Sequence, residues 1–296
     1  GIFQGDRSAA RLALIYDHDT ALLDIDRNQK TYLAELNGIQ EVLNRCHLPF
    51  DLISADRPDD LDPARHLACI IPDASALAEE KAEFYLNLET SHGIGCVWTG
   101  APGSLKEKSP SWWPRIGTSA VGAPRLFLEL DEAAPPQSYA SLTTPDHPLC
   151  QSIAASVLAM ADYYWPVEPV ERAETPLTRL PTFRLFPEGQ AYPHSETCAA
   201  ITRADALAIT LGQQIFLPFR AGLLAEKICH PDHDQLIINA LHIASAGKLA
   251  PLINGKPGLR LSQRKLADGR EALHIINTTG HHRFLNEFTP LHDVRV

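Results

Sequence analysis

The first hundred residues alternate short aliphatic runs with stretches in which apolar residues recur every three or four positions. The aliphatic runs lie at residues 11–16, 50–53, 67–71 and 94–99. Short continuous apolar runs between turn signals are typical of strands that are buried on both faces of a parallel sheet. The alternation therefore predicts an α/β fold, with a doubly wound, mostly parallel sheet that carries helices on both faces.

Two helices are predicted between these strands. The first carries an apolar stripe at helical spacing, which consists of Tyr32, Leu33, Leu36, Ile39, Val42 and Leu43. The second is predicted to begin at Ser75, because a serine can cap a helix and because Glu79 and Glu80 favour its first turn. This second helix is expected to end near Gly93.

The middle of the chain is rich in proline between residues 101 and 193, which predicts loops. Strands are expected within it at residues 125–130 and 182–185. The sequence indicates no order for these strands and no role for residues 103–181.

A hairpin and a helix are predicted after this region. Residues 207–211 and 214–218 flank a Gly-Gln pair and are typical of two strands joined by a tight turn. The helix is predicted to begin at Asp232 as its N-cap, with Gln235 in a capping-box position, and to end at Gly247.

The character of the sequence changes after residue 250. Residues 259–266 and 272–278 alternate as strands do, and an Asp-Gly pair between them predicts a turn. We therefore expect an α/β domain over residues 1–250 and a small all-β unit over residues 251–296. A strand-like run at the very end has no partner after it, and the chain starts without methionine, so a truncated unit in a fragment of a longer protein is expected.

Composition narrows the classes of partner. The chain has 26 Lys plus Arg against 36 Asp plus Glu, which gives a formal net charge of −10, so neither nucleic acid nor an anionic membrane is an expected partner. A neutral, sugar-like ligand suits this balance better. The six cysteines contain no C-x-x-C pair, and buried free thiols in a reducing, cytoplasmic setting are the expectation.

Several motifs resemble bacterial glycosidases that follow their catalytic barrel with a β-galactosidase trimerisation domain, which has a class I glutamine amidotransferase-like (flavodoxin-like) fold. The motifs are LALIYDHDT from Leu12, Gly38-Ile39, LPFD from Leu48, CIIPDA from Cys69, LAEE from Leu77, IGCVWTG from Ile94, IFLPFR from Ile215, PDH from Pro231 with Leu236 and NAL from Asn239, LHIINTTG from Leu273, and PLHDV from Pro290. One departure concerns the segments around the IGCVWTG strand, where Ser91-His92-Gly93 precedes it and GSLK from Gly103 follows it.

The resemblance implies that this chain itself has no catalytic role. In retaining glycosidases a pair of carboxylates about 5 Å apart cleaves the bond, and in the family this pair belongs to the barrel, which this sequence lacks. The resemblance thus implies a structural and oligomerisation region with no cofactor. Its implied partners are the (β/α)₈ barrel of the parent enzyme and further copies in a homo-oligomer, with the carbohydrate substrate reached through the parent.

An alternative within the same fold is a cysteine-dependent amidase or glutamine amidotransferase-like enzyme. Such enzymes place a cysteine at a strand-to-helix elbow and pair it with an H-x-E motif, and the candidates here are Cys96, His194 and Glu196. An elbow requires a small residue two positions after the nucleophile, whereas Val97 and Trp98 prolong the strand. We therefore expect Cys96 to be a buried, unreactive core residue.

Two further clusters each have more than one interpretation. Cys229, His230, His233 and Asp234 lie at a predicted helix start without the spacing that places two ligands on one face, so capping and solvent exposure are expected and no metal site is predicted. The aromatic clusters next to prolines are candidates for packing against a neighbouring domain or subunit, for ordinary core packing, or for direct contact with sugar. Their members are Trp112, Trp113, Tyr163, Tyr164 and Trp165.

Overall fold

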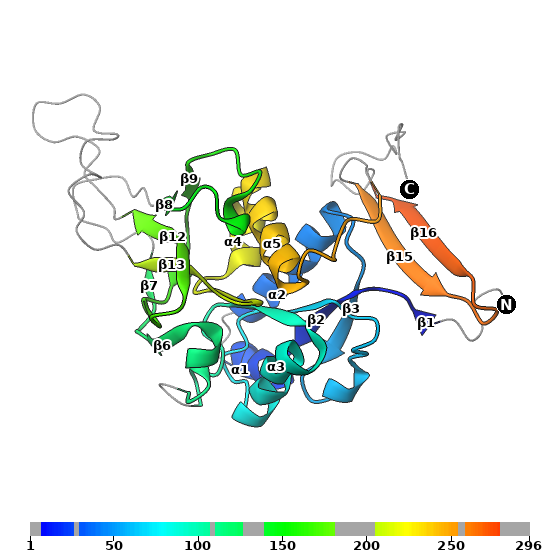
Figure 1. Ribbon diagram of the computed structural model, residues 1–296, viewed down its shortest axis with the longest axis horizontal. Helices are drawn as coiled ribbons and strands as arrows, with labels where there is room; N and C mark the ends of the chain where they lie inside the picture. The colour runs from blue at the N-terminus through cyan, green and yellow to red at the C-terminus, as the bar shows by residue number, and fades with distance from the viewer. Residues whose placement is uncertain are drawn as a thin grey trace, which may run out of the picture.

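A computed structural model describes residues 7–26, 30–106, 110–126, 139–180, 205–253 and 258–278. A nine-stranded sheet crosses the molecule in the order β3-β2-β4-β5-β14-β13-β12-β8-β9 (Figure 1). All strands of this sheet except β13 and β8 run in the same direction. The prediction of an α/β fold with a mostly parallel sheet is confirmed.

The parallel half of the sheet consists of five adjacent strands, β2 (Leu12–Tyr16), β3 (Phe50–Ser54), β4 (Ala68–Ile71), β5 (Gly95–Thr99) and β14 (Gln214–Leu217). Four of these strands are the aliphatic runs of the first hundred residues, and β4 is buried at every position. Numbered by their order along the chain, they lie in the sheet as 2-1-3-4-5, the order of flavodoxin-like folds.

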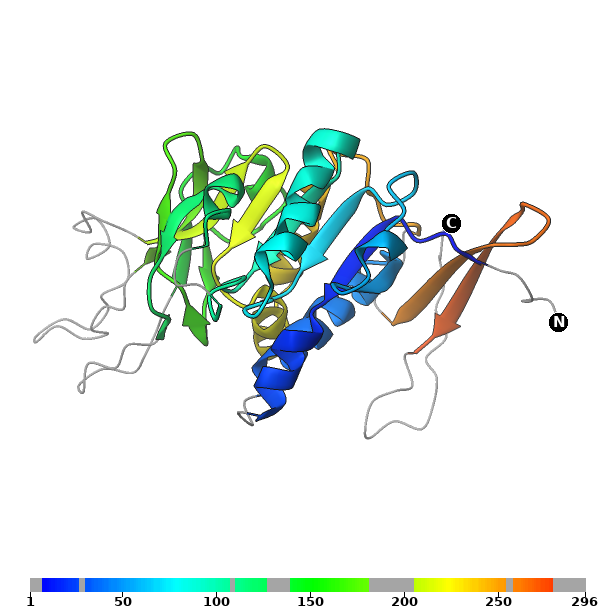
Figure 2. The same ribbon diagram turned by 90° about the horizontal axis from the view of Figure 1, so that it is seen from below.

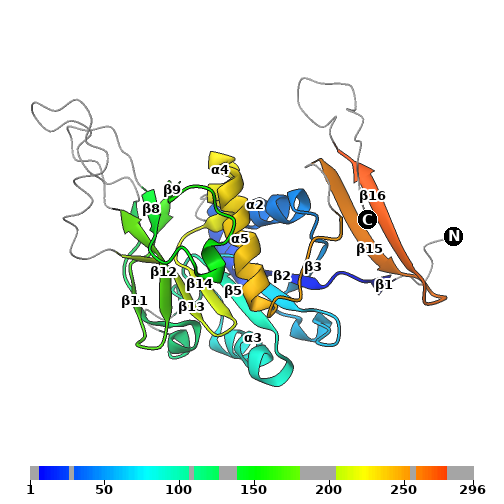
Figure 3. The same ribbon diagram turned by 45° about the horizontal axis from the view of Figure 1, so that its top comes forward.

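Helices cover both faces of this half. The helices α2 (Thr31–Arg45), α4 (Ala221–Ile228) and α5 (Pro231–Ala244) pack on one face, where they share a core with Leu14 and Val97. The helix α3 (Glu79–His92) packs on the other face against Ile71 and Trp98. Figure 3 shows α4 and α5 on the side of the sheet opposite α3. A further helix, α1 (His18–Asp26), follows β2 and was missed in the sequence, because its nine residues carry no regular apolar stripe.

Two glycines bring α2 and α4 into backbone contact. A Cβ built on Gly38 would lie 2.2 Å from the carbonyl oxygen of Gly222, and one built on Gly222 would lie 2.5 Å from the backbone nitrogen of Ile39. No side chain fits between backbones this close, so both positions require glycine. The contact places the N-terminus of α4 beside α2.

The antiparallel half of the sheet comes from the later and middle segments. The predicted hairpin is confirmed as β13 (Ala206–Leu211) and β14, and β12 (Glu174–Leu180), β8 (Tyr139–Leu142) and β9 (Val157–Ala159) extend the sheet beyond it. Two small pairs, β6 (Thr118–Val121) with β11 (Val167–Pro169) and β7 (Arg125–Leu126) with β10 (Tyr163–Tyr164), lie beside them. Short 3-10 helices lie at Pro58–Asp60, Trp113–Ile116 and Pro148–Cys150.

Of the predicted middle strands, the first is described over residues 125–126 only, and residues 127–130 and 182–185 lie outside the described part of the chain.

Two predicted helix caps were wrong. Helix α3 begins at Glu79 after Ala78, since the segment from Asp73 folds into turns in which the Ser75 N–H donates to the Asp73 carbonyl. Helix α5 is capped by His230, whose Nδ1 accepts from the Asp232 N–H at 3.2 Å. The Asp232 carboxylate accepts instead from the N–H groups of residues 154 and 155.

The C-terminal hairpin is confirmed, with β15 (Leu259–Lys265) and β16 (Glu271–Asn277) joined by the predicted Asp-Gly turn. A third strand, β1 (Arg7–Ser8), pairs with β15 from the other end of the chain. This small sheet is set off from the nine-stranded sheet (Figure 2). The strand-like run at residues 292–296 lies outside the described residues.

Candidate functional site

A cavity of about 780 Å³ opens at the carboxyl ends of the parallel strands. Ligands of open α/β sheets bind at this edge, at the point where the strand order reverses, which in this sheet lies between β2 and β4. The lining combines aromatic, aliphatic, hydroxyl and charged side chains. The lining residues include Thr20, Asp24, Tyr32, Asp73, Ser75, Ser104, Trp113, Tyr163, Trp165 and Arg220.

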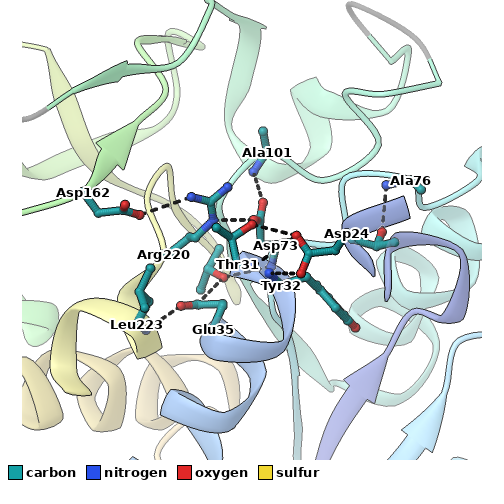
Figure 4. A network of polar contacts seen from close by, with 12 residues as sticks. Asp24, Thr31, Tyr32, Glu35, Asp73, Ala76, Ala101, Asp162, Arg220 and Leu223 are labelled. Atoms are coloured by element: carbon teal, nitrogen blue, oxygen red, sulfur yellow. Dashed lines mark hydrogen bonds and ion pairs between the residues drawn. The ribbon is translucent and has the colours of Figure 1, made fainter. Parts of the chain in front are cut away.

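An ion pair lies at the base of the cavity. The Nε of Arg220, in the segment that follows β14, donates to the carboxylate of Asp73, in the segment that follows β4, at 2.7 Å. The Ala101 N–H donates to the other carboxylate oxygen of Asp73 at 3.2 Å. Figure 4 shows Asp73 between Arg220 and Ala101. Burial raises the pKa of Asp73, and the Arg220 guanidinium opposes this rise.

The backbone around Asp73 is arranged to hold its carboxylate. Asp73 has a φ of 32°, in the left-handed region that side-chain-bearing residues rarely adopt. Gly100, at the end of β5, provides the space, because a Cβ there would lie 2.1 Å from the Asp73 carboxylate. Strain of this kind is concentrated at functional sites, so the geometry indicates that the position of this carboxylate matters.

Arg220 is fixed by more than Asp73. Its Nη1 donates to Asp162 at 3.2 Å, and Asp162 also lies 3.6 Å from the Lys227 ammonium. The guanidinium lies over the ring of Trp165, 5.1 Å from the ring centroid. Two carboxylates and an aromatic face therefore hold the guanidinium in one orientation.

A fully buried carboxylate lies behind the pair. Glu35 of α2 accepts from the Thr99 hydroxyl at 2.7 Å and from the Leu223 N–H at 2.8 Å. Thr99 in turn accepts from the Asp73 N–H at 3.0 Å, so hydrogen bonds connect the two acids (Figure 4). Burial raises the pKa of Glu35 to about 7.

The opposite wall of the cavity is formed by α1 and the start of α2. The Asp24 carboxylate accepts from the Thr31 N–H at 3.1 Å and from the Tyr32 N–H at 3.0 Å, which satisfies the free N-terminal amides of α2. The Tyr32 hydroxyl accepts from the Asp17 N–H at 2.6 Å, and burial raises the pKa of Tyr32. These bonds leave the wall rigid.

The proposed nucleophile of the amidase alternative does not lie in this cavity. Cys96 is fully buried near the start of β5, its thiol lies 3.5 Å from the Tyr85 carbonyl oxygen of α3, and burial raises the pKa of the thiol. The end of β5 carries Thr99, whose hydroxyl is engaged with Glu35. His194 and Glu196 lie outside the described residues.

The aromatic candidates separate into two groups. Trp112 and Trp113 are 2% and 1% exposed in the core with Trp98, and Tyr164 is fully buried, with its hydroxyl on Asp205 at 2.6 Å. Their burial leaves little surface for a partner. Trp113, Trp165 and Tyr163 line the cavity, but Trp113 and Trp165 are only 1% and 9% exposed, whereas Tyr163 is 40% exposed.

The residues weighed as metal ligands have other partners. The His233 ring faces the Ala159 carbonyl oxygen at 2.8 Å, Asp234 binds Arg45 at 2.7 Å, and His230 caps α5. Across the described part of the chain, no group of three or more His, Cys, Asp and Glu side chains is arranged to hold a metal ion.

Sequence reasoning missed Asp73, Arg220 and Glu35 as site residues. Asp73 lies just beyond Pro72 at the end of a fully buried strand, and carboxyl ends of such strands gather at the ligand-binding edge, so this position was a usable signal. Arg220 also follows a strand of the parallel set. Glu35 lies on the apolar face of α2, where its charge gave no indication of a partner.

No protein-family model matches the sequence, and a search of curated proteins finds no match. Solved structures do match in fold. The chain is similar to α-L-fucosidase isoenzyme 2 from Paenibacillus thiaminolyticus, with a TM-score of 0.63 and 13% identity over 95% of this chain and 40% of that one. For a β-galactosidase from Bacillus circulans sp. alkalophilus, the TM-score is 0.59 and the identity is 14%, over 93% of this chain and 36% of that one.

A GH42 β-galactosidase from G. stearothermophilus gives a TM-score of 0.59 and 12% identity over 92% of this chain and 35% of that one. The chain thus spans between about a third and two fifths of these enzymes. At these identities the likeness shows the fold alone, and in the neighbouring enzymes that fold forms one part of a longer chain. No described helix is both long and apolar enough to span a membrane.

Proposed function

We propose that this chain is a non-catalytic structural and oligomerisation region of a β-galactosidase-like glycoside hydrolase. The observation that carries the proposal is the fold likeness, which extends over more than nine tenths of this chain but only about two fifths of the neighbouring fucosidase. Its partners are then the catalytic barrel of the parent enzyme and further copies of the same chain, and the carbohydrate substrate is reached through the parent.

The burial of Cys96 supports this proposal over the amidase alternative. Nucleophilic catalysis requires a thiolate that reaches substrate, whereas Cys96 is fully buried against α3. The carboxyl end of β5 carries Thr99, which is fully buried and whose hydroxyl donates to the Glu35 carboxylate.

Exposed apolar side chains are candidates for the docking face. Leu105 and Tyr163 line the cavity, and Leu22 and Ile25 of α1 are 49% and 57% exposed. Exposed large apolar side chains are typical of interfaces between domains or subunits when they form a patch.

Enzyme assays test the proposal. The purified 296-residue chain is expected to hydrolyse no aryl β-galactoside, no aryl α-fucoside and no glutamine. The reading frame upstream of Gly1 is expected to encode a barrel of roughly 200 to 400 residues, and its complete product is expected to cleave a glycoside. Turnover by the 296-residue chain that survives repurification and is lost in Cys96→Ser, or on replacing one of its carboxylates, would overturn the proposal.

A further inference from the structure

We propose that the cavity at the carboxyl edge of the sheet binds a neutral hexopyranose. The inference goes beyond the structural role proposed above and rests on the cavity itself. A volume of about 780 Å³ lies in the range of small-molecule sites and exceeds the space that a single pyranose ring requires.

Aromatic surfaces suit the apolar faces of a sugar ring. Trp113, Tyr163 and Trp165 line the cavity, and the exposed ring of Tyr163 stands on the strand β10 beside buried Tyr164. Flat, amphipathic rings offer contact area together with a polar edge, and a pyranose presents the complementary pattern of C–H faces and hydroxyl edges.

Two serine hydroxyl groups of the lining are available for hydrogen bonds to a ligand. Ser75 and Ser104 both line the cavity and are partly exposed. Neither side chain hydrogen-bonds to the part of the chain that the structure describes. Both are free to donate and accept, as sugar hydroxyls require of their partners.

The charged groups argue against a phosphorylated ligand. The one cationic side chain of the described lining, Arg220, is already paired with Asp73 and Asp162, and Asp24 adds a further negative charge. Three backbone amides after β4 are also engaged, because the Ser75 and Leu77 N–H groups donate to carbonyls within the turn and the Ala76 N–H donates to Thr20. An anion would therefore find no free cradle of the kind that flavodoxin-like folds use for phosphate.

The paired charged groups can still bind hydroxyls. Each oxygen of the Asp73 carboxylate carries two acceptor sites, and one protein hydrogen bond is made to each. The fixed Arg220 guanidinium has further N–H groups beyond the two that are used. These groups are held in place before a ligand arrives, so binding costs little reorganisation.

Calorimetric titration and tryptophan fluorescence of the 296-residue chain test the inference with methyl gluco-, galacto- and mannopyranosides as probes. At least one is expected to bind saturably with a Kd on the order of 1 mM or tighter and to change the fluorescence. Glucose 6-phosphate is expected to bind more weakly than the matching glucoside.

Variants locate the binding. Ser75→Ala with Ser104→Ala is expected to weaken binding roughly tenfold without change in melting temperature, since neither hydroxyl serves the fold. Ser262→Ala, an exposed serine of β15, is the matched control and is expected to bind as the wild type does. Tyr163→Ala is expected to weaken binding and Ile275→Ala, of similar exposure, to leave it unchanged.

Three outcomes would overturn the inference. They are the absence of saturable binding of every pyranoside at roughly 10 mM, binding that is indifferent to the serine pair and to Tyr163, and tighter binding of the phosphorylated sugar than of the neutral one. Because the readout is binding by this chain alone, the result is independent of whether the parent enzyme is a glycosidase.

Discussion

The Nε of Arg220 and the carboxylate of Asp73 lie 2.7 Å apart, although 147 positions separate the two residues in the sequence. Asp73 follows β4 and Arg220 follows β14, and β5 runs between these strands in the sheet. Their side chains are only 5% and 13% exposed. The pair therefore joins strand ends across the floor of the cavity with little water to screen it.

Breaking this pair is expected to destabilise the protein far more than breaking a surface pair. Arg220→Ala leaves the Asp73 carboxylate buried and uncompensated, and the free energy of unfolding is expected to fall by about 3 to 5 kcal/mol. Arg260→Ala is the control, because Arg260 binds Glu41 at the same 2.7 Å with both side chains more than two fifths exposed, and its loss is expected to stay below about 1 kcal/mol. Urea denaturation measures both, and equal losses would show that burial does not set the strength of the pair.

The buried carboxylate of Glu35 is expected to make stability depend on pH. Its pKa is raised from 4.5 to about 7 by burial, so the folded protein keeps a proton that the unfolded chain releases. The contribution of Glu35 to the free energy of unfolding is fully present below about pH 4.5. It falls by roughly 3 kcal/mol in total as pH rises to about 7.

The variant Glu35→Gln isolates this effect from the other titrating groups. The difference in unfolding free energy, wild type minus variant, is expected to fall steadily between about pH 5 and pH 7 and then to level off. A difference that stays flat across this window, measured by urea denaturation at each pH, would mean that Glu35 stays ionised in the folded protein.

Gly100 is expected to be intolerant of any side chain. Gly100→Ala would place a Cβ against the Asp73 carboxylate in addition to straining a φ of 69°. Gly93 has a φ of 67° with no atom within 4 Å of an added Cβ, so Gly93→Ala measures the strain alone, about 1 to 2 kcal/mol. Gly100→Ala is expected to lower the free energy of unfolding by at least about 1 kcal/mol more than Gly93→Ala does, as measured by thermal or urea unfolding. Equal losses would show that the Asp73 side chain moves aside without cost.

The strand pattern was predictable because burial on both faces leaves a direct trace in the sequence. β4 and β5 are buried at every position, and neither run contains a charged residue. Boundaries were less predictable: the helix start expected at Ser75 was wrong because residues 73–77 fold into turns, which begin with a positive φ at Asp73. The residues of the candidate site come from distant segments that meet only in the folded protein, and spacing along the chain does not indicate such contacts.

The aromatic clusters illustrate the same limit. Proline neighbours indicated loops for Trp112 and Trp113, and the structure does place them at a turn and a 3-10 helix. The loop nonetheless folds inward, where Trp112 lies 5.4 Å from Trp98 between ring centroids and the Trp113 indole donates to the Pro102 carbonyl oxygen at 3.0 Å. Whether a loop tryptophan faces the core depends on long-range packing, which local sequence does not encode.

Cys96 is expected to resist alkylation in the folded protein. Its thiol is fully buried and its pKa is raised, so little thiolate forms and no reagent reaches it. Cys229 is exposed and serves as the internal comparison. Mass spectrometry after a short iodoacetamide pulse at neutral pH is expected to find label on Cys229 and none on Cys96, whereas rapid labelling of Cys96 would revive the amidase alternative.

Self-association is expected to depend on Tyr163 and not on the buried tryptophans. Trp112→Ala empties space in the core, which lowers the free energy of unfolding by about 3 to 5 kcal/mol, and the fraction that remains folded is expected to sediment as the wild type does. Tyr163→Ala removes a ring that is 40% exposed, so folding is expected to be nearly unchanged. A dimer or higher oligomer of this variant is expected to dissociate at a higher protein concentration than the wild-type oligomer does. Sedimentation velocity over a concentration series, with circular dichroism as the check on folding, compares the three proteins. An oligomer that survives Tyr163→Ala intact would place the contact elsewhere on the surface, with the exposed leucine and isoleucine of α1, Leu22 and Ile25, next to be substituted.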